Sequence, residues 1–337
     1  MSPIRVIIYG VGYINQLATR LMREKGIEVV GAINRAGSKI GKDLGEVANL
    51  DAPIGVVISQ DAERILKTPA DLVLVGIYDD MERMYPIFEQ CLAHKLNVIS
   101  VGAHHSYPWR MSPEHTAKLD VLAKRHGVTI TGTGNQDFFA VNLATLMSGV
   151  CHRINRITHR SLTDANNFGR EVAEVTYVDR TLADFESQSD NHPPSIYTTF
   201  WENVASDLNL EVVDIRQRLE PVVAEQAQYC LALERTIEPG RLLGIRQHLE
   251  VVTNQGLAMN GENEIRVCHP DEEEFKEWEI YGEPSYKVKA TGMDSGLTTT
   301  TQCVNRIPHV IAAPPGYVTL EKLPKLTYRS KLSVDKP

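Results

Sequence analysis

Residues 4–15 read Ile-Arg-Val-Ile-Ile-Tyr-Gly-Val-Gly-Tyr-Ile-Asn, a short apolar run followed directly by two closely spaced glycines. Apolar runs with little polar alternation are typical of parallel strands that helices cover on both faces. Gly10 suits the tight turn that follows such a strand. Gly12 carries no Cβ, so a pyrophosphate can approach the backbone at the start of the next helix. The stretch predicts a strand, a dinucleotide-binding loop and a helix, although Asn15 replaces the usual third glycine, and an ordinary strand-to-helix turn is the alternative.

The same pattern continues through the first 130 or so residues. Further short apolar runs occupy 28–34, 54–59, 71–78, 96–101 and 128–131. Helical patterns lie between them at 13–25, 80–94 and 113–126, the last with Ser112 as N-cap and Pro113 at the first helical position. Strands alternating with helices predict an α/β fold, a Rossmann-type doubly wound parallel sheet.

The pattern changes in the second half of the chain, where polar and apolar residues alternate. Runs of this kind at 156–162, 228–236, 242–253, 264–268, 277–281 and 286–290 predict a mainly antiparallel sheet in an α+β domain. Helices are expected at 171–185 and 196–208, divided by the breaker-rich 190–194, and at 296–313, where Pro314 ends the helix. We therefore expect a dinucleotide-binding domain over 1–135, a substrate domain over 136–295 and a C-terminal helix and tail over 296–337.

Composition narrows the class of partner. The 337 residues are 42% hydrophobic and 23% charged, which is typical of a globular protein, and the net charge of −8 disfavours nucleic acid and anionic membranes. Five widely separated cysteines without a C-x-x-C pair indicate neither a zinc site nor a disulfide framework, and no other metal-ligand spacing is seen. No targeting signal or long apolar run is visible. We expect a cytoplasmic protein with a small-molecule substrate.

The end of the second strand indicates which dinucleotide binds. It reads Ala32-Ile33-Asn34-Arg35, without the acidic residue that would accept hydrogen bonds from the ribose of NAD. Arg35, with Ser38, Lys39 and Lys42 behind it, could instead pair with a 2′-phosphate. The sequence thus favours NADP (NADPH), with NAD as a further option, while solvated charges at a sheet edge are the alternative interpretation.

Several segments together resemble a known superfamily. They are Gly10-Val11-Gly12, the stretch 97–109 ending in Tyr107-Pro108-Trp109, Gly127-Val128-Thr129 with Gly132-Thr133-Gly134, and 304–308 with 313–316. Together they resemble the dihydrodipicolinate-reductase-like superfamily, in particular 2,4-diaminopentanoate dehydrogenase and the native amine dehydrogenases. The resemblance implies a homodimer made by the substrate domain and a C-terminal segment that packs back near the cofactor domain. It also implies NAD(P)H-dependent interconversion of a carbonyl compound plus ammonia with an amine.

Three places depart from that family pattern. Amine-forming members carry a glutamate pair before the Tyr-Pro-Trp element, where this chain has Ala103 and His104, followed by His105. Asn135-Gln136-Asp137 stands where Asn-Pro-Gly is usual, and Asp294-Ser295-Gly296 where His-Gly-Asp is usual. The changes lie around the expected active site, so they bear on substrate and reaction.

The catalytic candidates follow from these departures. His104 follows the fifth strand at the ligand-binding edge of the sheet, so it could donate a proton as hydride arrives; a loop histidine bonded to backbone is the alternative. Neighbouring residues in an extended loop tend to point opposite ways, so we expect only one of His104 and His105 to face the site. Tyr107 and Asp137 are further catalytic candidates, with a packing role and a helix N-cap as their alternatives.

The remaining site predictions form two sets. The expected cofactor-binding residues are Gly10, Gly12, Tyr13, Ile14, Asn34, Arg35, Ser38, Lys39, Gly76, Ile77, Tyr78, Val101, Gly102, Ala103, Thr133 and Asn135. The expected substrate-pocket residues are His105, His159, Asn166, Tyr177, Tyr197 and Trp201. For the second set, solvated sheet positions and an apolar core are the alternatives.

Three functions remain open at this point. The first is an NADP-preferring, amine dehydrogenase-like oxidoreductase that performs reductive amination or oxidative deamination. The second is an ammonia-independent NADPH-dependent reductase of ketones, aldehydes or cyclic imines. The third is a catalytically inactive NADPH-binding sensor. Turnover with and without ammonium separates the first two, and tight binding without turnover identifies the third.

Overall fold

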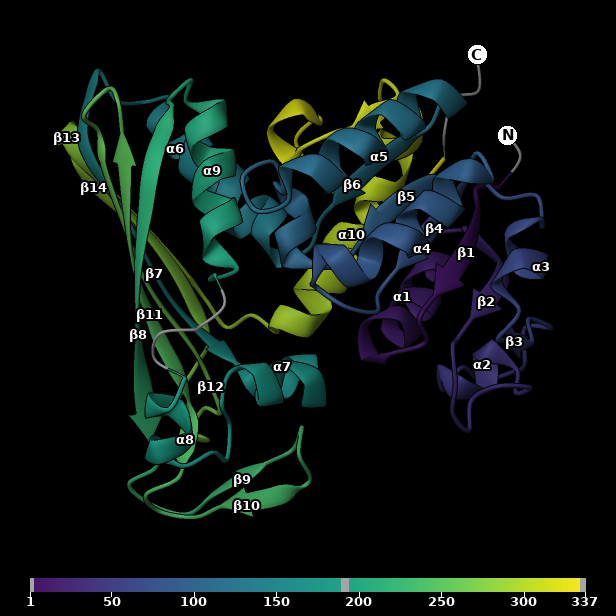
Figure 1. The fold of residues 1–337 in the computed structure, drawn as a ribbon, viewed down its shortest axis with the longest axis horizontal. Helices are drawn as coiled ribbons and strands as arrows, with labels where there is room; N and C mark the ends of the chain where they lie inside the picture. The colour runs from purple at the N-terminus through teal and green to yellow at the C-terminus, as the bar shows by residue number, and fades with distance from the viewer. Residues whose placement is uncertain (1–2, 189–193, 334–337) are drawn as a thin grey trace. The chain divides into compact units, whose positions relative to one another are not determined.

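The computed structural model describes residues 3–188 and 194–333, and the chain divides into two compact units (Figure 1). One unit comprises Met1–Phe138 and Leu297–Pro337, and the other Phe139–Gly296. The C-terminal segment therefore belongs to the same unit as the N-terminal half. Across the described ranges, no helix is both long and apolar enough to cross a membrane.

The first unit is built on a seven-stranded parallel sheet. Its order is β15-β6-β5-β4-β1-β2-β3, so β1 lies between β4 and β2. The strands are β1 (Arg5–Tyr9), β2 (Glu28–Ile33), β3 (Ile58–Ser59), β4 (Leu72–Val75), β5 (Asn97–Ser100), β6 (Thr129–Gly132) and β15 (Gly316–Tyr317). The helices are α1 (Tyr13–Glu24), α2 (Leu44–Val47), α3 (Ala62–Leu66), α4 (Met81–Ala93), α5 (Pro113–His126) and most of α10 (Ser295–Ala312), with short 3-10 turns η1 (Ala103–Ser106) and η5 (Leu320–Lys322). The predicted doubly wound fold is confirmed.

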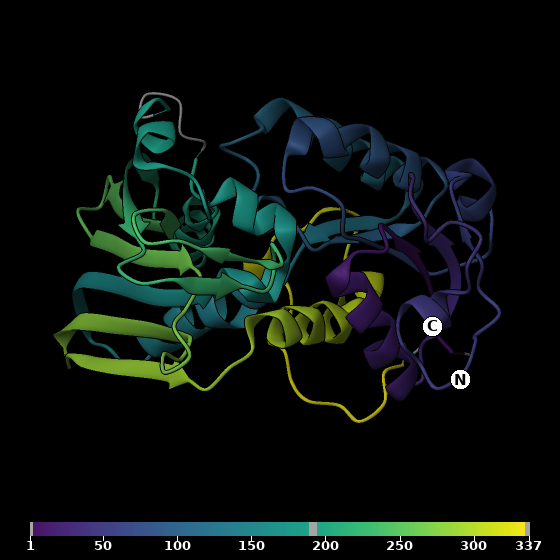
Figure 2. The same cartoon turned by 90° about the horizontal axis from the view of Figure 1, so that it is seen from below.

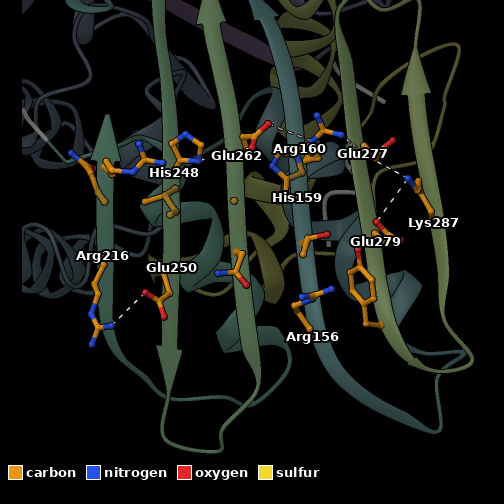
Figure 3. Close-up of a pocket in the computed structure, with 17 residues that line it drawn as sticks. Arg156, His159, Arg160, Arg216, His248, Glu250, Glu262, Glu277, Glu279 and Lys287 are labelled. Carbon is orange, nitrogen blue, oxygen red and sulfur yellow. Dashed lines mark hydrogen bonds and ion pairs between the residues drawn. The ribbon is translucent and has the colours of Figure 1, made fainter. Parts of the chain in front are cut away.

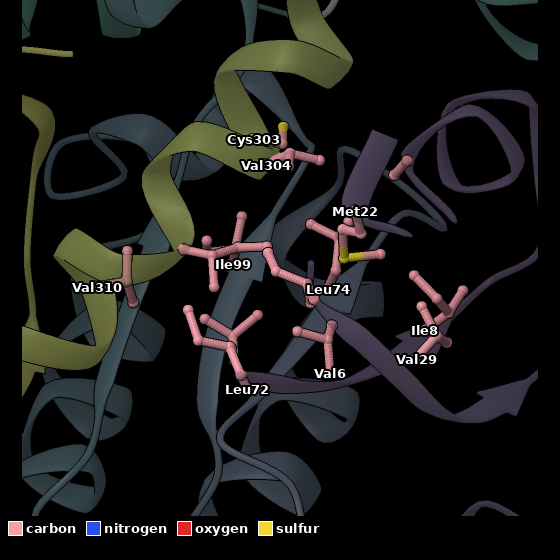
Figure 4. Close-up of a cluster of buried hydrophobic side chains, with 14 of the residues drawn as sticks. Val6, Ile8, Met22, Val29, Leu72, Leu74, Ile99, Cys303, Val304 and Val310 are labelled. Carbon is pink, nitrogen blue, oxygen red and sulfur yellow. The ribbon is translucent and has the colours of Figure 1, made fainter. Parts of the chain in front are cut away.

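Alternate residues of β1 enter two separate cores. Val6 and Ile8 pack with α1 and α10, as Figure 4 shows for Met22, Cys303, Val304 and Val310. Ile7 and Tyr9 face the opposite side, where α4 and α5 contribute the other core. Because both faces are covered, each position of the strand must be apolar, and this is why the run lacks polar alternation.

The second unit is a six-stranded mixed sheet with helices and a hairpin (Figures 1 and 2). Its order is β14-β13-β7-β12-β11-β8; the β7–β12 pair is parallel and the other pairs are antiparallel. The sheet strands are β7 (Arg153–Asp164), β8 (Val212–Val223), β11 (Leu242–Thr253), β12 (Ala258–Arg266), β13 (Phe275–Glu283) and β14 (Tyr286–Thr291), and the hairpin is β9 (Gln228–Cys230) with β10 (Arg235–Ile237). The helical segments are most of η2 (Asp137–Asn142), α6 (Leu143–Ser148), η3 (Ala165–Phe168), α7 (Arg170–Val175), α8 (Leu182–Glu186) and α9 (Tyr197–Asp207).

Several sequence predictions need correction in this unit. The helix expected over 171–185 is two short helices, because Tyr177 and Asp179 between them adopt left-handed backbone conformations with φ of 63° and 62°. The strand expected over 228–236 is the β9–β10 hairpin, and β8 was missed, although its charged Arg216, Arg218 and Glu220 alternate with Ile215, Gln217 and Leu219. Of the predicted break at 190–194, only Pro194 lies within the described residues.

The core of the first unit gives a first test. Leu74 in β4 is fully buried, so Leu74→Ala should leave a cavity and lower the free energy of unfolding by about 2–5 kcal/mol. Val121→Ala, at an exposed position of α5, should change it by no more than about 0.5 kcal/mol. Urea titration monitored by circular dichroism measures the free energy of unfolding of both variants. Equal losses in the two would contradict the place of Leu74 in the core.

Candidate functional site

The phosphate loop is shaped by a close backbone contact. Gly10 has φ of +87°, and a Cβ placed there would lie 2.3 Å from the carbonyl oxygen of Gly76. Gly12 begins α1 as its N-cap without a side-chain capping bond, and a Cβ on Gly12 would meet nothing within 4 Å. The loop therefore combines a tight turn with open space at a helix N-terminus, as pyrophosphate binding requires.

Asn15 performs a fastening role where a third glycine is usual. The side chain is buried, and its Nδ2 donates hydrogen bonds to the carbonyl oxygens of Gly10 at 2.7 Å and Tyr9 at 3.3 Å. A Cβ at Gly76 would lie 3.0 Å from that same nitrogen, so the glycine after β4 makes room for the amide. The departure from the three-glycine pattern thus preserves the loop's geometry.

Residues after β2 also reach the phosphate loop. Asn34 Oδ1 accepts a hydrogen bond from the Val11 amide at 3.2 Å, and Lys39 Nζ donates to the Val11 carbonyl at 2.6 Å. Partial burial lowers the pKa of Lys39. Arg35 donates to the Tyr78 hydroxyl, and Ser38 is exposed. Three of the predicted cofactor residues from this loop, Asn34, Arg35 and Lys39, therefore contact β1–α1 or the end of β4.

His104 lies in η1, directly after β5. Its backbone N–H donates to Asp79 Oδ1 at 2.8 Å, and its ring Nδ1 is 3.7 Å from Asp79 Oδ2. The other ring nitrogen, Nε2, is buried and has no hydrogen-bond partner among the described residues. The arrangement holds the ring against a carboxylate on one side and leaves the second nitrogen without a partner among the described residues.

His105 does not line a substrate pocket, in contrast to the sequence prediction. The side chain is fully buried beneath the sheet edge, where Nδ1 lies 2.7 Å from Ser100 Oγ and the ring packs edge-on against Phe88. Burial lowers the pKa of His105 to about 4, so the ring is neutral near pH 7. Both histidines lie in a 3-10 helix and not in the extended loop on which the prediction was based, and of the two it is His104 whose ring lies beside Asp79.

Asp137 belongs to a buried ion pair, and this geometry disfavours the predicted catalytic role. Its two oxygens accept bonds from Arg306 Nε at 2.7 Å and Nη2 at 2.6 Å, and both side chains are fully buried. Thr133 donates to the same carboxylate at 2.8 Å, so this predicted cofactor residue is also tied inward. Arg306 further donates to the Pro324 carbonyl. The pair fixes α10 and the C-terminal tail to the end of β6.

Two other predicted residues belong to the first unit. Asn135 Oδ1 accepts a long 3.5 Å bond from Thr298 in α10. Tyr107 is half-buried just after η1, and nearby Trp109 packs edge-on against Tyr317. The packing role is thus evident for Trp109, while the catalytic role of Tyr107 stays a prediction.

The predicted substrate residues of the second unit separate into two groups. His159 in β7 and Tyr197 and Trp201 in α9 gather around Trp278, whose ring centre is 4.4 Å from that of His159 and 5.2 Å from that of Trp201. Burial lowers the pKa of His159 to about 3. Asn166 instead accepts a bond from the Ala232 amide, and Tyr177 packs on Phe185. The structure therefore brings together His159, Tyr197 and Trp201, but not Asn166 and Tyr177.

A broad hollow of about 690 Å³ covers the charged face of the second unit's sheet (Figure 3). Several of its charges are paired across the strands: Arg160 with Glu262 and Glu277, Lys287 with Glu277 and Glu279, and Arg216 with Glu250. Such pairing satisfies the charges internally, and it suits a solvated or associating surface better than a catalytic one.

Sequence reasoning missed two residues at the edge of the first unit's sheet. Asp79 lies in the loop between β4 and α4 and contacts His104, and Arg83 in the first turn of α4 lies over the Tyr78 ring. A usable signal existed, because β4 and β5 are neighbours in the expected strand order and their carboxyl ends must meet.

Family comparisons agree with this geometry. Residues 138–330 match the 2,4-diaminopentanoate dehydrogenase C-terminal domain, and residues 4–132 match the dihydrodipicolinate reductase N-terminus. The chain is 26% identical to 2,4-diaminopentanoate dehydrogenase from Acetoanaerobium sticklandii, over 96% of this chain and 94% of that protein.

Solved structures extend the comparison. The amine dehydrogenase from Mycobacterium smegmatis is 36% identical, with a TM-score of 0.95 over 98% of this chain and 99% of the other. Biliverdin reductase from Synechocystis, solved with biliverdin and NADP+, is 16% identical over 95% of each chain, with a TM-score of 0.58, and shares the fold.

The buried histidines predict a pH dependence of stability. The pKa of His105 in the folded chain, about 4, lies below the ordinary value of 6.5, so its contribution to stability is complete above pH 6.5 and is lost as the pH falls towards 4. His105→Asn keeps a polar group near Ser100 Oγ but removes the titrating ring, so the free energy of unfolding should decline less as the pH falls. The exposed His152→Asn should leave it unchanged. Urea unfolding at pH 4 to 8 measures this, and parallel profiles for His105→Asn and the parent would contradict it.

Proposed function

Because this chain belongs to the family of 2,4-diaminopentanoate dehydrogenase, we propose that it is an NADP-preferring oxidoreductase that interconverts a small carbonyl compound and the corresponding amine. The observation that carries the proposal is the His104–Asp79 pair at the carboxyl edge of a sheet whose first loop fits a dinucleotide. Ligands of open α/β sheets bind at this edge.

The residues present fit a nicotinamide dinucleotide. The Gly10–Gly76 contact and the open space at Gly12 form a cradle that side chains would fill. The loop after the second strand, where such folds bind the adenosine ribose, contains Asn34, Arg35 and Lys39. It has no carboxylate among residues 34–39 that would accept hydrogen bonds from the 2′-hydroxyl of NAD. When bound, the nicotinamide ring would supply or accept the hydride.

In this proposal His104 moves the proton. Nε2 would donate to the substrate oxygen or nitrogen as the carbon is reduced, and would take the proton back in the reverse direction. Asp79 orients the ring, because its carboxylate receives the backbone N–H and lies beside Nδ1. His105, Thr133 and Asp137 support the surrounding backbone through buried bonds.

A second candidate is a carbonyl or cyclic-imine reductase that uses no free ammonia. It is favoured by His104, because the resemblance places a glutamate pair at 103 and 104 in the amine-forming enzymes. In this chain Asp79 is the carboxylate beside that position, and one of its oxygens is already engaged by the His104 backbone. Which of the two reactions the protein performs, reductive amination or reduction without ammonia, depends on whether Asp79 can bind ammonium.

We also propose that two copies associate through the charged sheet face. Positive and negative side chains lie side by side over its strands, so the face offers a second copy partners of both signs. Most of the surrounding charge is already paired within one copy, and ordered water would fill the hollow where the faces do not meet.

Ammonium dependence tests the function. We expect NADPH oxidation with small ketones or aldehydes to require concentrated ammonium and to yield the amine. His104→Gln should reduce kcat about 100-fold or more with little change in NADPH binding, because proton transfer contributes about that much. Asp79→Asn should give a smaller loss.

The controls separate the alternatives. Equal oxidation without ammonium identifies the second candidate, and tight NADPH binding without turnover of ketones, aldehydes or cyclic imines would indicate a sensor. Unchanged kcat in His104→Gln, with His152→Asn as the matched exposed control, would contradict the role given to His104.

Solution mass tests the association. We expect light scattering to report twice the chain mass, and Arg160→Glu, which reverses a charge paired with Glu262 and Glu277, to shift the protein towards a single copy. Arg125→Glu, on α5 of the other unit, should not shift it. A single-copy mass for the parent chain would contradict the proposal.

A further inference from the structure

We propose that Arg83, at the first turn of α4, is the second arm of a clamp that grips the 2′-phosphate of the dinucleotide together with Arg35. The inference rests on the proposed function and extends it, since Arg83 lies about 50 residues along the chain from the second-strand motif that pointed to NADP. The ligand chemistry is a phosphate monoester on an adenosine ribose.

Tyr78 brings the two guanidinium groups together. The central guanidinium carbon of Arg83 lies 3.2 Å from the centre of the Tyr78 ring, and that of Arg35 lies 4.6 Å from it. Arg35 also donates a hydrogen bond to the Tyr78 hydroxyl. A single aromatic ring thus positions two cations within reach of one phosphate group.

The strand order explains why these residues meet. Arg35 follows β2, while Tyr78 and Arg83 follow β4, and β1 with its phosphate loop lies between those two strands. The arms therefore approach the adenosine end of the loop from both sides. Lys39 adds a third positive charge at the Val11 carbonyl of that loop.

The charges of the two arginines are not neutralised by carboxylates. Within 3–188 and 194–333, neither guanidinium has a carboxylate oxygen within 4.0 Å. The nearby acids have other roles: Asp79 binds His104, and Asp80 caps α4 by accepting from the Arg83 backbone at 2.8 Å. The positive field is evident at Tyr78, whose pKa is lowered by the hydrogen bond from Arg35 and by the charges of Arg35 and Arg83.

A phosphate satisfies this arrangement better than a neutral ribose does. Two planar guanidinium groups offer paired N–H donors that match phosphate oxygens, and the N-terminal turn of α4 adds a favourable dipole. A 2′-hydroxyl would leave both cations unpaired. The clamp therefore predicts discrimination at the 2′ position, separate from binding of the rest of the dinucleotide.

The experiment compares two small probes that differ only by this phosphate, adenosine 2′,5′-bisphosphate and adenosine 5′-monophosphate. Calorimetric titration of the full chain with each probe gives the Kd of the monophosphate divided by the Kd of the bisphosphate. Arg83→Gln should reduce this ratio about tenfold or more by weakening binding of the bisphosphate, as should Arg35→Gln, with little change in the Kd of the monophosphate. In steady-state assays the same variants should raise KM for NADPH and not for NADH.

Arg125→Gln is the matched control, because this exposed arginine lies in the last turn of α5, which leads to β6, and β5 separates β6 from β4. It should leave the ratio unchanged. Arg83 is exposed, so its variant is expected to retain the thermal midpoint of the parent.

The outcomes are distinguishable. The parent chain could prefer the bisphosphate while Arg83→Gln leaves the ratio of the two Kd values unchanged. This result would overturn the clamp and leave the proposed function intact. A parent that binds both probes equally and turns over NADH would overturn the clamp and the NADP preference alone. Failure to bind either probe or either dinucleotide would overturn the proposed function and, with it, the clamp.

Discussion

The contact between the carboxyl ends of β1 and β4 sets the geometry of the whole ligand-binding edge. Gly10 approaches the Gly76 carbonyl so closely that no side chain fits, and Asn15 fastens the same turn through two backbone carbonyls. This contact fixes where the chain leaves β4, and hence where Tyr78 and Asp79 stand. Arg35 and His104 reach those two residues from the neighbouring strands β2 and β5.

Burial separates side chains that look alike in sequence. His104 and His105 are adjacent, yet one has a ring nitrogen beside Asp79 and the other is sealed against Phe88 and Ser100. The cost of charging a group away from water keeps His105 neutral and excludes it from proton exchange near pH 7. A catalytic role for His104 is therefore compatible with a structural one for its neighbour.

Charged side chains also fall into two groups: those paired with an opposite charge within the protein, and those that remain available to a ligand. Arg306 is fully buried and bidentate on Asp137, and removing either partner would strand a charge in the core. Arg160 and Arg216 on the second unit's sheet face pair with neighbouring glutamates. Arg35 and Arg83 instead share an aromatic ring, which positions cations without neutralising them.

The sequence by itself determined the Rossmann fold, because strands covered on both faces must be apolar throughout and helices must repeat at 3.6 residues. It also placed Gly10, Gly12 and Arg35 near one another, since the order of strand, glycine turn and helix constrains the path of the chain. The strand β8 was missed even though its charged and uncharged residues alternate, whereas the break at Tyr177 and Asp179 could not be predicted, because its left-handed residues are not glycines.

Only the tertiary structure decided which polar residues meet. Asp137 pairs with Arg306, 169 positions away, and Arg83 reaches Tyr78 beside Arg35; neither pairing follows from local pattern. The physical reason is that strand and helix periodicity depends on the burial of apolar groups, which is nonspecific. Hydrogen bonds and ion pairs require particular atoms at about 3 Å, and the folded chain alone brings those atoms to that distance.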